Sequence, residues 1–256
     1  MLKDKTAVVL GVANKRSIAW ATAQELSEQG VRLLLTYQGE RVEQSVRELA
    51  ATIPGTICLS CDVTQDEDIA ALMAKAGESS GGGLDFLVHS VAFARSEDLA
   101  GSFSSVTREG WRMALDISAF SLVALTRAVA PLMEQRGGGS VVTMTFLGSE
   151  RVAPNYNVMG VAKAALECSV RYLAHEFGPK NIRVNAVSAG PIRTLSASGV
   201  AGFKGMLEVM SERSPLKRNI DAHEVGRTAR FLLSPDAGGI TGQVVYVDAG
   251  YCIMGV

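Results

Sequence analysis

Two side chains with proton chemistry, Tyr156 and Lys163, lie seven residues apart in the run YNVMGVAKAALECSVRYL. Apolar residues recur in this run at intervals of three and four, which predicts a helix over 156–177. At about 3.6 residues per turn, both side chains fall on one face of that helix, roughly 10 Å apart along its axis. They could act together on one ligand, but a helix that carries an unrelated Tyr and Lys would show the same spacing.

A phenol and an ammonium in this arrangement are suited to stabilising negative charge on a carbonyl oxygen. Lys163 would hold the hydroxyls of a bound ribose and, through its positive charge, lower the proton affinity of the Tyr156 phenol. The phenol would then hydrogen-bond to a carbonyl oxygen that becomes anionic during a reaction. The spacing therefore makes both residues candidates for catalysis, and Lys163 also a candidate for cofactor binding, with the unrelated pair still open.

The elements that must position this pair follow from the pattern of apolar residues. Short runs rich in β-branched residues alternate with amphipathic stretches of helical length, which predicts repeated β-α units. Most of these runs are almost continuous in apolar residues, as expected when helices cover both faces of a parallel sheet. We predict one doubly wound α/β domain over 1–256 with a seven-stranded parallel sheet. Strands are expected at 6–10, 32–37, 56–61, 86–89, 140–146, 182–188 and 244–247, and helices at 18–29, 41–51, 66–76, 108–135, 156–177 and 222–233.

One segment stands outside this alternation. Residues 195–215 lack a predicted strand, follow a Gly-Pro turn and are mixed in polarity. A loop followed by a helix in this position could close over a bound ligand. We predict a substrate-binding lid in this segment.

The first strand runs directly into GVANKRSIAW, which has features of a phosphate-binding turn. Gly11 can form a tight turn, and Ser17 can cap a helix that begins at Ile18. The first amides of such a helix, with its positive dipole, suit the pyrophosphate of a dinucleotide. An ordinary β-α turn explains the segment equally well, because the usual G-x-G-x-x-G is absent and only Gly11 remains.

The ends of the second and third strands offer polar groups for an adenosine. Gln38 can hydrogen-bond to a ribose hydroxyl, whereas a 2'-phosphate would call for Arg or Lys, and Arg41 comes only after Gly39 and Glu40. NADH is therefore favoured over NADPH. Asp62 could accept a hydrogen bond from the adenine amino group, and it could equally be a cap for the helix that follows.

The chain as a whole limits the classes of function that remain. It has 256 residues, 47% of them hydrophobic, a formal net charge of −1 and a pI of about 6.3. No global positive field is available to hold a nucleic acid. The first apolar run has the length of a strand and not of a signal-peptide core, and no apolar stretch approaches about 20 residues. We predict a cytoplasmic protein that binds neither nucleic acid nor membrane.

The four cysteines are Cys58, Cys61, Cys168 and Cys252. Cys58 and Cys61 form a Cys-x-x-Cys inside a strand-like run, where successive side chains alternate between faces, so we expect them to diverge. No Cys-rich or His-rich cluster indicates a metal site or a disulfide framework. We expect reduced thiols and no metal.

The motifs around Tyr156 and Lys163 make the pair specific. The run PNYNVMGVAKAALE, together with GVANKRSIAW, DVT, HSVAFA, SAGPIRT and VVYVDAG, is similar to the bacterial NADH-dependent enoyl-acyl-carrier-protein reductases over essentially the full chain. These enzymes belong to the short-chain dehydrogenase/reductase superfamily. Other members place the lysine four residues after the tyrosine, where this chain has Gly160. The wider spacing is typical of the enoyl reductase branch.

The resemblance implies a Rossmann-type fold, usually a homotetramer, that transfers hydride from NADH to the β-carbon of a trans-2-enoyl thioester. That reaction is the last step of the fatty acid elongation cycle, and its substrate is bound to acyl carrier protein. By analogy Tyr156 would stabilise the enolate oxygen, Lys163 would hold the nicotinamide ribose and help to relay the proton, and the Thr194 hydroxyl would contact a phosphate. Substrate contacts are expected at Ala94 and Tyr156, and cofactor contacts at Gly11, Ser17, Ile18, Gln38, Asp62, Val63, Ser90, Val91, Lys163, Ile192, Arg193, Thr194, Leu195 and Ser196. Three of these residues, Ile18, Val63 and Val91, would be core residues in any α/β domain.

Two departures from the family pattern lie around the expected acyl pocket. The family has a second catalytic tyrosine ten residues before Tyr156, where this chain has Phe146, whose ring cannot donate a hydrogen bond. The usual glycine before Phe-Ala in HSVAFA is Ala92, which adds a methyl group near the ligand. We expect diaryl-ether inhibitors to bind less well to this protein than to its relatives.

Two other functions remain open at this point. A dehydrogenase of the same fold could act on ketones or secondary alcohols, and a panel of substrates would distinguish it. A NAD-binding regulatory protein with impaired catalysis is the third possibility, for which Phe146 is the only indication. It would bind NADH without turning over an enoyl substrate.

Overall fold

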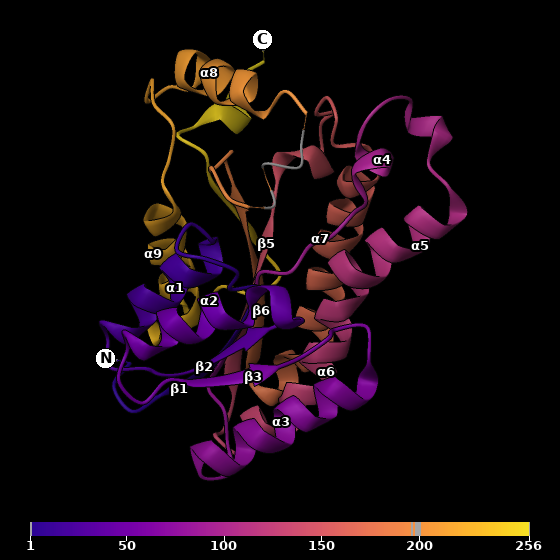
Figure 1. Ribbon diagram of the computed structural model, residues 1–256. Coiled ribbons are helices and arrows are strands. Elements are labelled where there is room, and N and C mark those ends of the chain that lie inside the picture. The colour runs from indigo at the N-terminus through magenta and orange to yellow at the C-terminus, as the bar shows by residue number, and fades with distance from the viewer. Residues whose placement is uncertain (1, 196, 198–200, 256) are drawn as a thin grey trace.

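A computed structural model describes residues 2–195, 197 and 201–255. Within these residues seven parallel strands form one sheet in the order β3-β2-β1-β4-β5-β6-β7, as predicted (Figure 1). The strand order reverses between β1 and β4, and such a switch point is where open α/β sheets bind ligands. The strands are β1 (Thr6–Leu10), β2 (Arg32–Tyr37), β3 (Ile57–Ser60), β4 (Phe86–His89), β5 (Gly139–Thr145), β6 (Ile182–Ala189) and β7 (Val244–Val247).

Two apolar cores lie on opposite faces of this sheet. In β1 the side chains of Ala7 and Val9 enter one core, and those of Val8 and Leu10 enter the other. This alternation follows from the two-residue period of a strand and explains why β1 is apolar throughout. The doubly wound prediction is confirmed.

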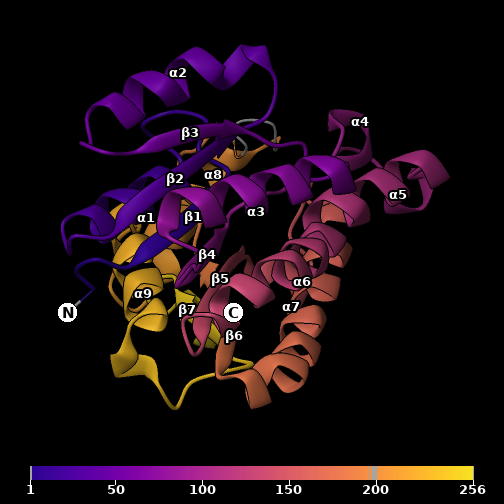
Figure 2. The same ribbon diagram turned by 90° about the horizontal axis from the view of Figure 1, so that it is seen from below.

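Three helices cover each face of the sheet (Figure 2). The first core is closed by α1 (Ile18–Ser27), α2 (Glu40–Ala51) and α9 (Ala222–Leu233). The second is closed by α3 (Asp66–Ser80), α6 (Ser121–Glu134) and α7 (Asn157–Phe177). Leu122 and Leu125 of α6 are fully buried, and each such side chain contributes about 1.5–3 kcal/mol relative to an exposed one.

Most element boundaries agree with the sequence prediction, and the largest difference is the end of α3. This helix continues four residues past the predicted end, to Ser80, because it ends at Gly81 in the left-handed conformation with φ 72°. Gly77, the residue after the predicted end at Ala76, lies inside the helix. Short 3-10 turns occur at Phe103–Ser105, Leu147–Ser149, Gly178–Lys180, Pro235–Ala237 and Tyr251–Ile253.

The predicted helix over 108–135 is continuous but not uniform. It consists of α5 (Arg108–Leu115), a π turn at Asp116–Phe120 and α6. Arg108–Glu134 has 27 residues with a mean hydropathy of 1.5 in its most apolar window, enough by length and composition to cross a membrane. The expectation that no apolar stretch approaches a span is therefore wrong. Because 56% of that window is buried inside the protein, packing in the core accounts for its apolar character.

The cysteine pair diverges as predicted. The Cys58 thiol lies 3.9 Å from the carbonyl oxygen of Val46 in α2, on the side of the first core. Cys61 is buried in the second core. Both are free thiols, and burial raises the pKa of Cys61 to about 12, so this thiol stays protonated.

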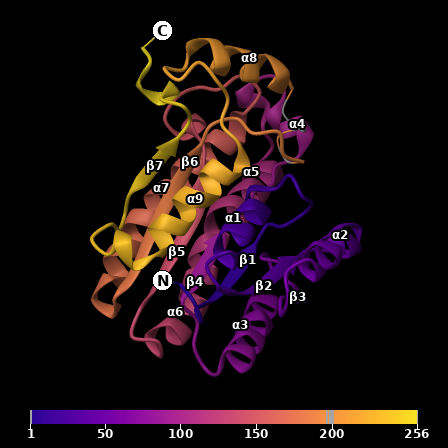
Figure 3. The ribbon, with the colours of Figure 1, turned by 90° about the vertical axis from the view of Figure 1, so that its left-hand side faces the viewer.

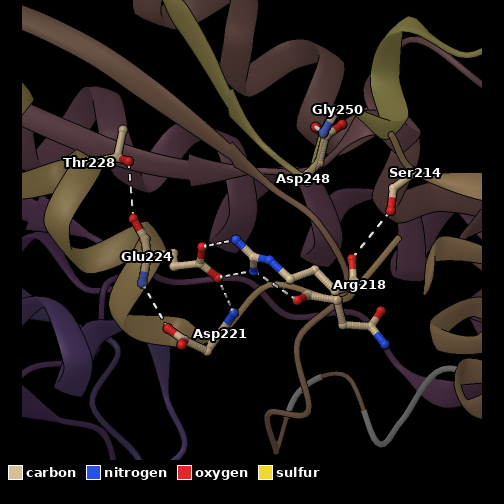
Figure 4. Close-up of polar contacts among 8 residues, drawn as sticks. Ser214, Arg218, Asp221, Glu224, Thr228, Asp248 and Gly250 are labelled. Carbon is tan, nitrogen blue, oxygen red and sulfur yellow. Dashed lines mark hydrogen bonds and ion pairs between the residues drawn. The ribbon is translucent and has the colours of Figure 1, made fainter. Parts of the chain in front are cut away.

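Two helices lie beyond the carboxyl ends of the strands, α4 (Ser96–Leu99) and α8 (Phe203–Arg213) (Figure 3). The α8 helix occupies the predicted lid segment, of which residues 196 and 198–200 lie outside the described residues. Its carboxyl end is fastened to α9: Ser214 donates to the carbonyl oxygen of Arg218, and the Arg218 guanidinium contacts both carboxylate oxygens of Glu224 at 2.7 and 2.9 Å (Figure 4). Glu224 and Asp221 form the capping box of α9.

Candidate active site

Two adjoining cavities run along the carboxyl edge of the sheet. The β1–β4 cavity, of about 700 Å³, is lined by residues that follow β1, β2, β3 and β4. The Tyr156 cavity, of about 340 Å³, lies between the loop after β4, the end of β5, the start of α7 and the start of α8. Both cavities are lined by Ala92 and Phe93, so one elongated ligand could extend through the two.

Gly11 is required by the close approach of two strand ends. Its φ is +96°, and a Cβ at this position would overlap the carbonyl oxygen of Ser90. Only glycine satisfies both conditions. Gly11 and Ser90 both line the β1–β4 cavity, and the pyrophosphate contact at Gly11 stays a prediction.

The prediction for Ser17 is wrong in its detail. Ser17 is the residue before α1, but its hydroxyl donates to the carbonyl oxygen of Asn14 at 2.7 Å and accepts no hydrogen bond from the helix. The side-chain oxygen of Asn14 accepts a hydrogen bond from the backbone amide of Arg16, which forms a local turn. Because of this turn, the Ser17 hydroxyl points to Asn14 and not to the start of the helix. The hydroxyl therefore leaves the first amides of α1 uncapped.

Gln38 and Asp62 lie next to each other at the rim of the β1–β4 cavity. The Gln38 amide donates to Asp62 Oδ2 at 3.1 Å, and Asp62 Oδ1 accepts from the amide and the hydroxyl of Thr64. Partial burial raises the pKa of Asp62, but the hydrogen bonds from Thr64 and Gln38 outweigh it and hold the pKa below its usual value. Gln65, not Asp62, occupies the cap position of α3. The capping alternative for Asp62 is therefore excluded.

The Tyr156 cavity contains the phenol that the sequence singled out. Tyr156 is the residue before α7, and its ring meets Phe146 edge to face, with 5.0 Å between centroids and an interplanar angle of 71°. Ala94 and Thr194 line the same cavity. Thr194 accepts a hydrogen bond from the amide of Ala197, whereas a phosphate would use its hydroxyl as a donor.

Lys163 lies behind the tyrosine, against β5. Its side chain is 5% exposed, and Nζ donates to the carbonyl oxygen of Met144 at 2.8 Å. Desolvation lowers the pKa of Lys163 to about 8, while the charge of Glu167 opposes that shift. At neutral pH the ammonium form therefore predominates.

The pKa of the Tyr156 phenol is shifted in the direction opposite to the expected effect of Lys163. Desolvation, followed by the negative charge of Glu167, raises the pKa of Tyr156 above its usual value. Tyr156 therefore keeps its proton at neutral pH. A protonated phenol can donate a hydrogen bond to an oxygen that becomes negative.

A π turn fixes the loop that separates the two cavities. Ser118, in the turn, accepts the backbone amide of Phe93 at 2.9 Å and donates to the Phe93 carbonyl at 3.1 Å. A π turn places one extra residue in a helix and is common at functional sites. Ser118 thereby holds Ala92 and Phe93 in position between the cavities.

Comparison with known proteins decides the family. The chain matches the family model described as enoyl-(acyl carrier protein) reductase over residues 11–252. The chain belongs to this family. It is 50% identical to the enoyl-[acyl-carrier-protein] reductase [NADH] FabI of Bacillus cereus over 100% of this chain and 99% of that one, and 50% identical to the Bacillus subtilis protein of the same name over 98% and 97%. A crystal structure of the B. cereus reductase with NADP⁺ and an indole naphthyridinone superimposes with a TM-score of 0.96, covering 100% of this chain and 99% of that one.

Most of the residues predicted from the resemblance to the enoyl reductases lie at the two cavities. Tyr156, Phe146, Ala94, Ile18, Ile192 and Thr194 line the Tyr156 cavity, and Gly11, Gln38, Asp62, Val63, Ser90, Val91 and Leu195 line the β1–β4 cavity. Of the described residues, Ser17, Lys163 and Arg193 are not among those that line either cavity, and Ser196 lies outside the described residues. The roles of all these residues stay predictions.

Several residues at the site of this enoyl reductase family member were not predicted. Arg41 and Tyr37 line the β1–β4 cavity, and Phe203 and Met206 of α8 line the Tyr156 cavity. Arg41 had a signal in the sequence, since it follows the second strand, but the apolar side chains had none. Phe203 and Met206 support the placement of a lid at α8, which stays a prediction.

Residues 252 and 254 are tied to the loop between β5 and α7, which leads into Tyr156. Arg151, between β5 and α7, donates to the carbonyl oxygens of Cys252 and Met254 at 2.8 Å each. Among the described residues no group of three His, Cys, Asp or Glu side chains is placed to hold a metal ion.

Proposed function

We propose that this protein reduces trans-2-enoyl thioesters carried by acyl carrier protein to saturated acyl thioesters, using NADH, in fatty acid elongation. The observation that carries the proposal is Tyr156, with Lys163 behind it, at a cavity that adjoins a dinucleotide-sized one. Full-length relatives at 50% identity are named as NADH-dependent enoyl reductases. Dehydrogenases of other short-chain families, with lysine four residues after tyrosine, do not match this spacing.

The residues present fit a dinucleotide. Gly11 gives the close backbone approach that a pyrophosphate needs, the first amides of α1 stay uncapped, and Gln38 and Asp62 provide polar groups for the adenosine. NADH supplies the hydride that reaches the β-carbon of the substrate. Ile18 and Thr194, at the Tyr156 cavity, would place the reactive end of the cofactor beside Tyr156.

Tyr156 acts in this proposal as a hydrogen-bond donor to the thioester oxygen. Its raised pKa keeps the phenol protonated, so the donor is in place when negative charge develops on the oxygen. Lys163, an ammonium below its pKa of about 8, would hold the ribose hydroxyls and help to return a proton. Phe146 packs against Tyr156 and cannot share in the donation.

The first test replaces Tyr156 with Phe, which removes the donor and keeps the ring. We expect kcat for NADH oxidation with a crotonyl thioester to fall by about 10²–10³, with the NADH dissociation constant changed little. A Tyr156→Phe protein that turns over at full rate would remove the assigned role.

The wild-type protein provides the control for reaction type. Turnover of ketones or secondary alcohols in place of enoyl thioesters would favour the other dehydrogenase class. NADH binding without turnover of any enoyl thioester would favour a regulatory protein.

We also propose a homotetramer and a lid over 195–215, both from the resemblance to the family. Exposed apolar side chains on α5, the π turn and α7, namely Trp111 at 39%, Phe120 at 49% and Tyr172 at 73% exposure, support association of several copies. Phe203 and Met206 support the lid. Light scattering of the purified protein gives the subunit number. A cytoplasmic location agrees with the proposed substrate and stays a prediction.

Cofactor choice has a specific residue to examine. NADH fits Gln38, and the two Bacillus relatives carry NADH in their names, whereas two Staphylococcus aureus relatives, 48% and 47% identical, carry NADPH and the B. cereus structure contains NADP⁺. Arg41 lines the β1–β4 cavity, where its guanidinium could pair with a 2'-phosphate. Parallel assays with NADH and NADPH measure the preference directly.

A further inference from the structure

The end of β5 is tied to α7 by two side chains that lie one helical turn apart. Lys163 donates to the carbonyl oxygen of Met144, and Glu167 accepts the hydroxyl of Thr145 at 2.6 Å. Met144 and Thr145 are consecutive, and the next residue is Phe146, whose ring contacts Tyr156. Because residues four apart share a helix face, Lys163 and Glu167 point toward the same strand.

Glu167 is unusual because it is an ionisable residue in a buried position, with 6% exposure. A carboxylate removed from water is costly unless it is paired and hydrogen-bonded. Thr145 supplies a hydrogen bond but no charge, and among the described residues no direct ion pair joins Glu167 to a cation.

Lys163, one turn away on the same face of α7, is the cation whose pKa the Glu167 charge raises, and the titratable groups of β4 and β7 beside the pair are neutral. His89 of β4 is fully buried, and burial and then the Lys163 charge lower its pKa to about 3, so it stays neutral. Tyr246 of β7 donates to Glu150 at 2.6 Å, and its phenol stays protonated because burial and that hydrogen bond raise its pKa. Tyr156 also stays protonated. Glu167 is the negative charge that favours the ammonium form of Lys163.

We propose that Glu167, held in place by Thr145, is a positioning residue that keeps Lys163 in its ammonium form beside the nicotinamide ribose. Nothing in the assigned roles of Tyr156 and Lys163 includes this carboxylate. Desolvation alone would favour the neutral amine, which could neither stabilise negative charge nor return a proton. This inference rests on the proposed function, in which Lys163 must be protonated when the substrate is reduced.

The test compares pH profiles of kcat for variants that separate charge from shape. Glu167→Gln keeps the length of the side chain and an acceptor for the Thr145 hydroxyl, but removes the charge. We expect the alkaline fall in kcat to move to lower pH by about one unit or more. For a shift of one unit from a pKa of about 8, activity at pH 7.5 falls about threefold, whereas activity at pH 6 stays near that of the wild type.

Two further variants provide controls. Glu167→Asp restores the charge on a shorter side chain, and we expect its profile to return toward that of the wild type. Glu176→Gln removes the same charge from an exposed position of the same helix and should leave the profile unchanged. A Glu167→Gln profile that coincides with the wild type, or an equal loss of activity at every pH, overturns the proposal.

A measurement without cofactor or substrate tests the same point independently. Nuclear magnetic resonance of protein with ¹³C-labelled lysine ε-carbons follows the titration of Lys163, whose signal is identified by its loss in Lys163→Met. We expect the Lys163 titration to move to lower pH in Glu167→Gln, and an unchanged midpoint overturns the proposal. If the wild type fails to reduce any enoyl thioester but this midpoint moves, the proposed function fails and the effect of Glu167 on Lys163 stands.

Discussion

Ala92 brings a methyl group to the wall between the β1–β4 cavity and the Tyr156 cavity. It packs with Ala94, Leu115 and Tyr156 against a small apolar cluster that includes Met159. A flat diaryl ether that lies between Tyr156 and the cofactor would meet this methyl group. We expect Ala92→Gly to lower the inhibition constant of such a compound, because glycine removes the obstruction. Inhibition measured before and after the substitution tests this, and an unchanged constant would remove the idea.

His89 makes the stability of the fold depend on acid pH. In the folded protein Nδ1 lies 2.7 Å from the Thr143 hydroxyl and Nε2 lies 2.9 Å from the Ser121 hydroxyl, and the pKa is lowered to about 3. An unfolded histidine has a pKa of about 6.5. Between these values the unfolded chain binds one more proton, so stability decreases as the pH falls from about 6.5 toward 3, by at most about 1.4 kcal/mol per unit.

We therefore expect the melting temperature of the wild type to fall more steeply from pH 6.5 to 5 than that of His89→Gln. The comparison of slopes removes the general loss caused by the new side chain itself. His175→Gln, at an exposed position of α7, should keep the wild-type slope. Equal slopes in the wild type and His89→Gln would contradict the assignment.

At the level of single residues, the sequence was most informative where backbone geometry or helical spacing restricts the choice. Gly11 was predictable because a tight turn beside a sheet demands glycine, whereas the seven-residue spacing of Tyr156 and Lys163 predicted only a shared helix face, and their joint role stays a prediction. Phe203 and Met206 were not predictable, because an apolar side chain at a cavity has the same sequence pattern as one in a core. Glu167 was missed for a related reason, since a glutamate on a helix usually faces solvent.

Among the elements, α9 begins at a complete capping box, formed by Asp221 and Glu224. Asp221 accepts the backbone amide of Glu224 at 2.9 Å, and the Glu224 carboxylate accepts the amide of Asp221 at 3.0 Å. Arg218 brings the chain that leaves α8 to the same carboxylate. We expect Asp221→Ala to cost about 1 kcal/mol, which lowers the melting temperature by about 2–4 °C.

The exposed Asp236 provides the matched substitution for this experiment. Asp236→Ala should change the melting temperature by less than Asp221→Ala, because its side chain is not part of a capping box. A similar fall in melting temperature in both variants would show that the capping box of α9 does not contribute to stability. Circular dichroism of both variants gives the two temperatures.

Strands were predicted more closely than helix ends, and the reason is physical. A buried parallel strand shows its full length as an apolar run, as β1 and β2 do. A helix end depends on which residue adopts the left-handed conformation, and either Gly77 or Gly81 could have ended α3. The π turn at Asp116–Phe120 leaves the apolar pattern of its helix almost unchanged, so the sequence pattern did not predict the hydrogen bond between Ser118 and Phe93.

At the scale of the whole molecule, the site joins both halves of the sheet. The β1–β4 cavity is built from the first half, and Tyr156 and Lys163 come from the second, on α7. A cofactor bound across the two should therefore stabilise the entire fold. With free NADH at one hundred times its dissociation constant, we expect a stabilisation of about 2.7 kcal/mol and a rise in melting temperature of about 5–11 °C.

For each variant, the melting temperature with NADH is compared with that of the same variant without NADH. Gly11→Ala should lose most of the rise, because the new methyl group overlaps Ser90 and disturbs the phosphate end of the site. Tyr156→Phe should keep it. A wild-type protein that melts at the same temperature with and without NADH would contradict the proposed site.

The hydrogen bonds that hold residues 252 and 254 bear on how the protein can be attached to a surface. Arg151 donates hydrogen bonds to the carbonyl oxygens of Cys252 and Met254. A force applied to a linker attached after these residues would therefore reach the loop that leads into Tyr156. The amino end emerges at the far side of the molecule from α8 (Figure 1). Attachment through the amino-terminal side would therefore place no force on the loop between β5 and α7, whereas a tether after Met254 would pull on that loop through Arg151.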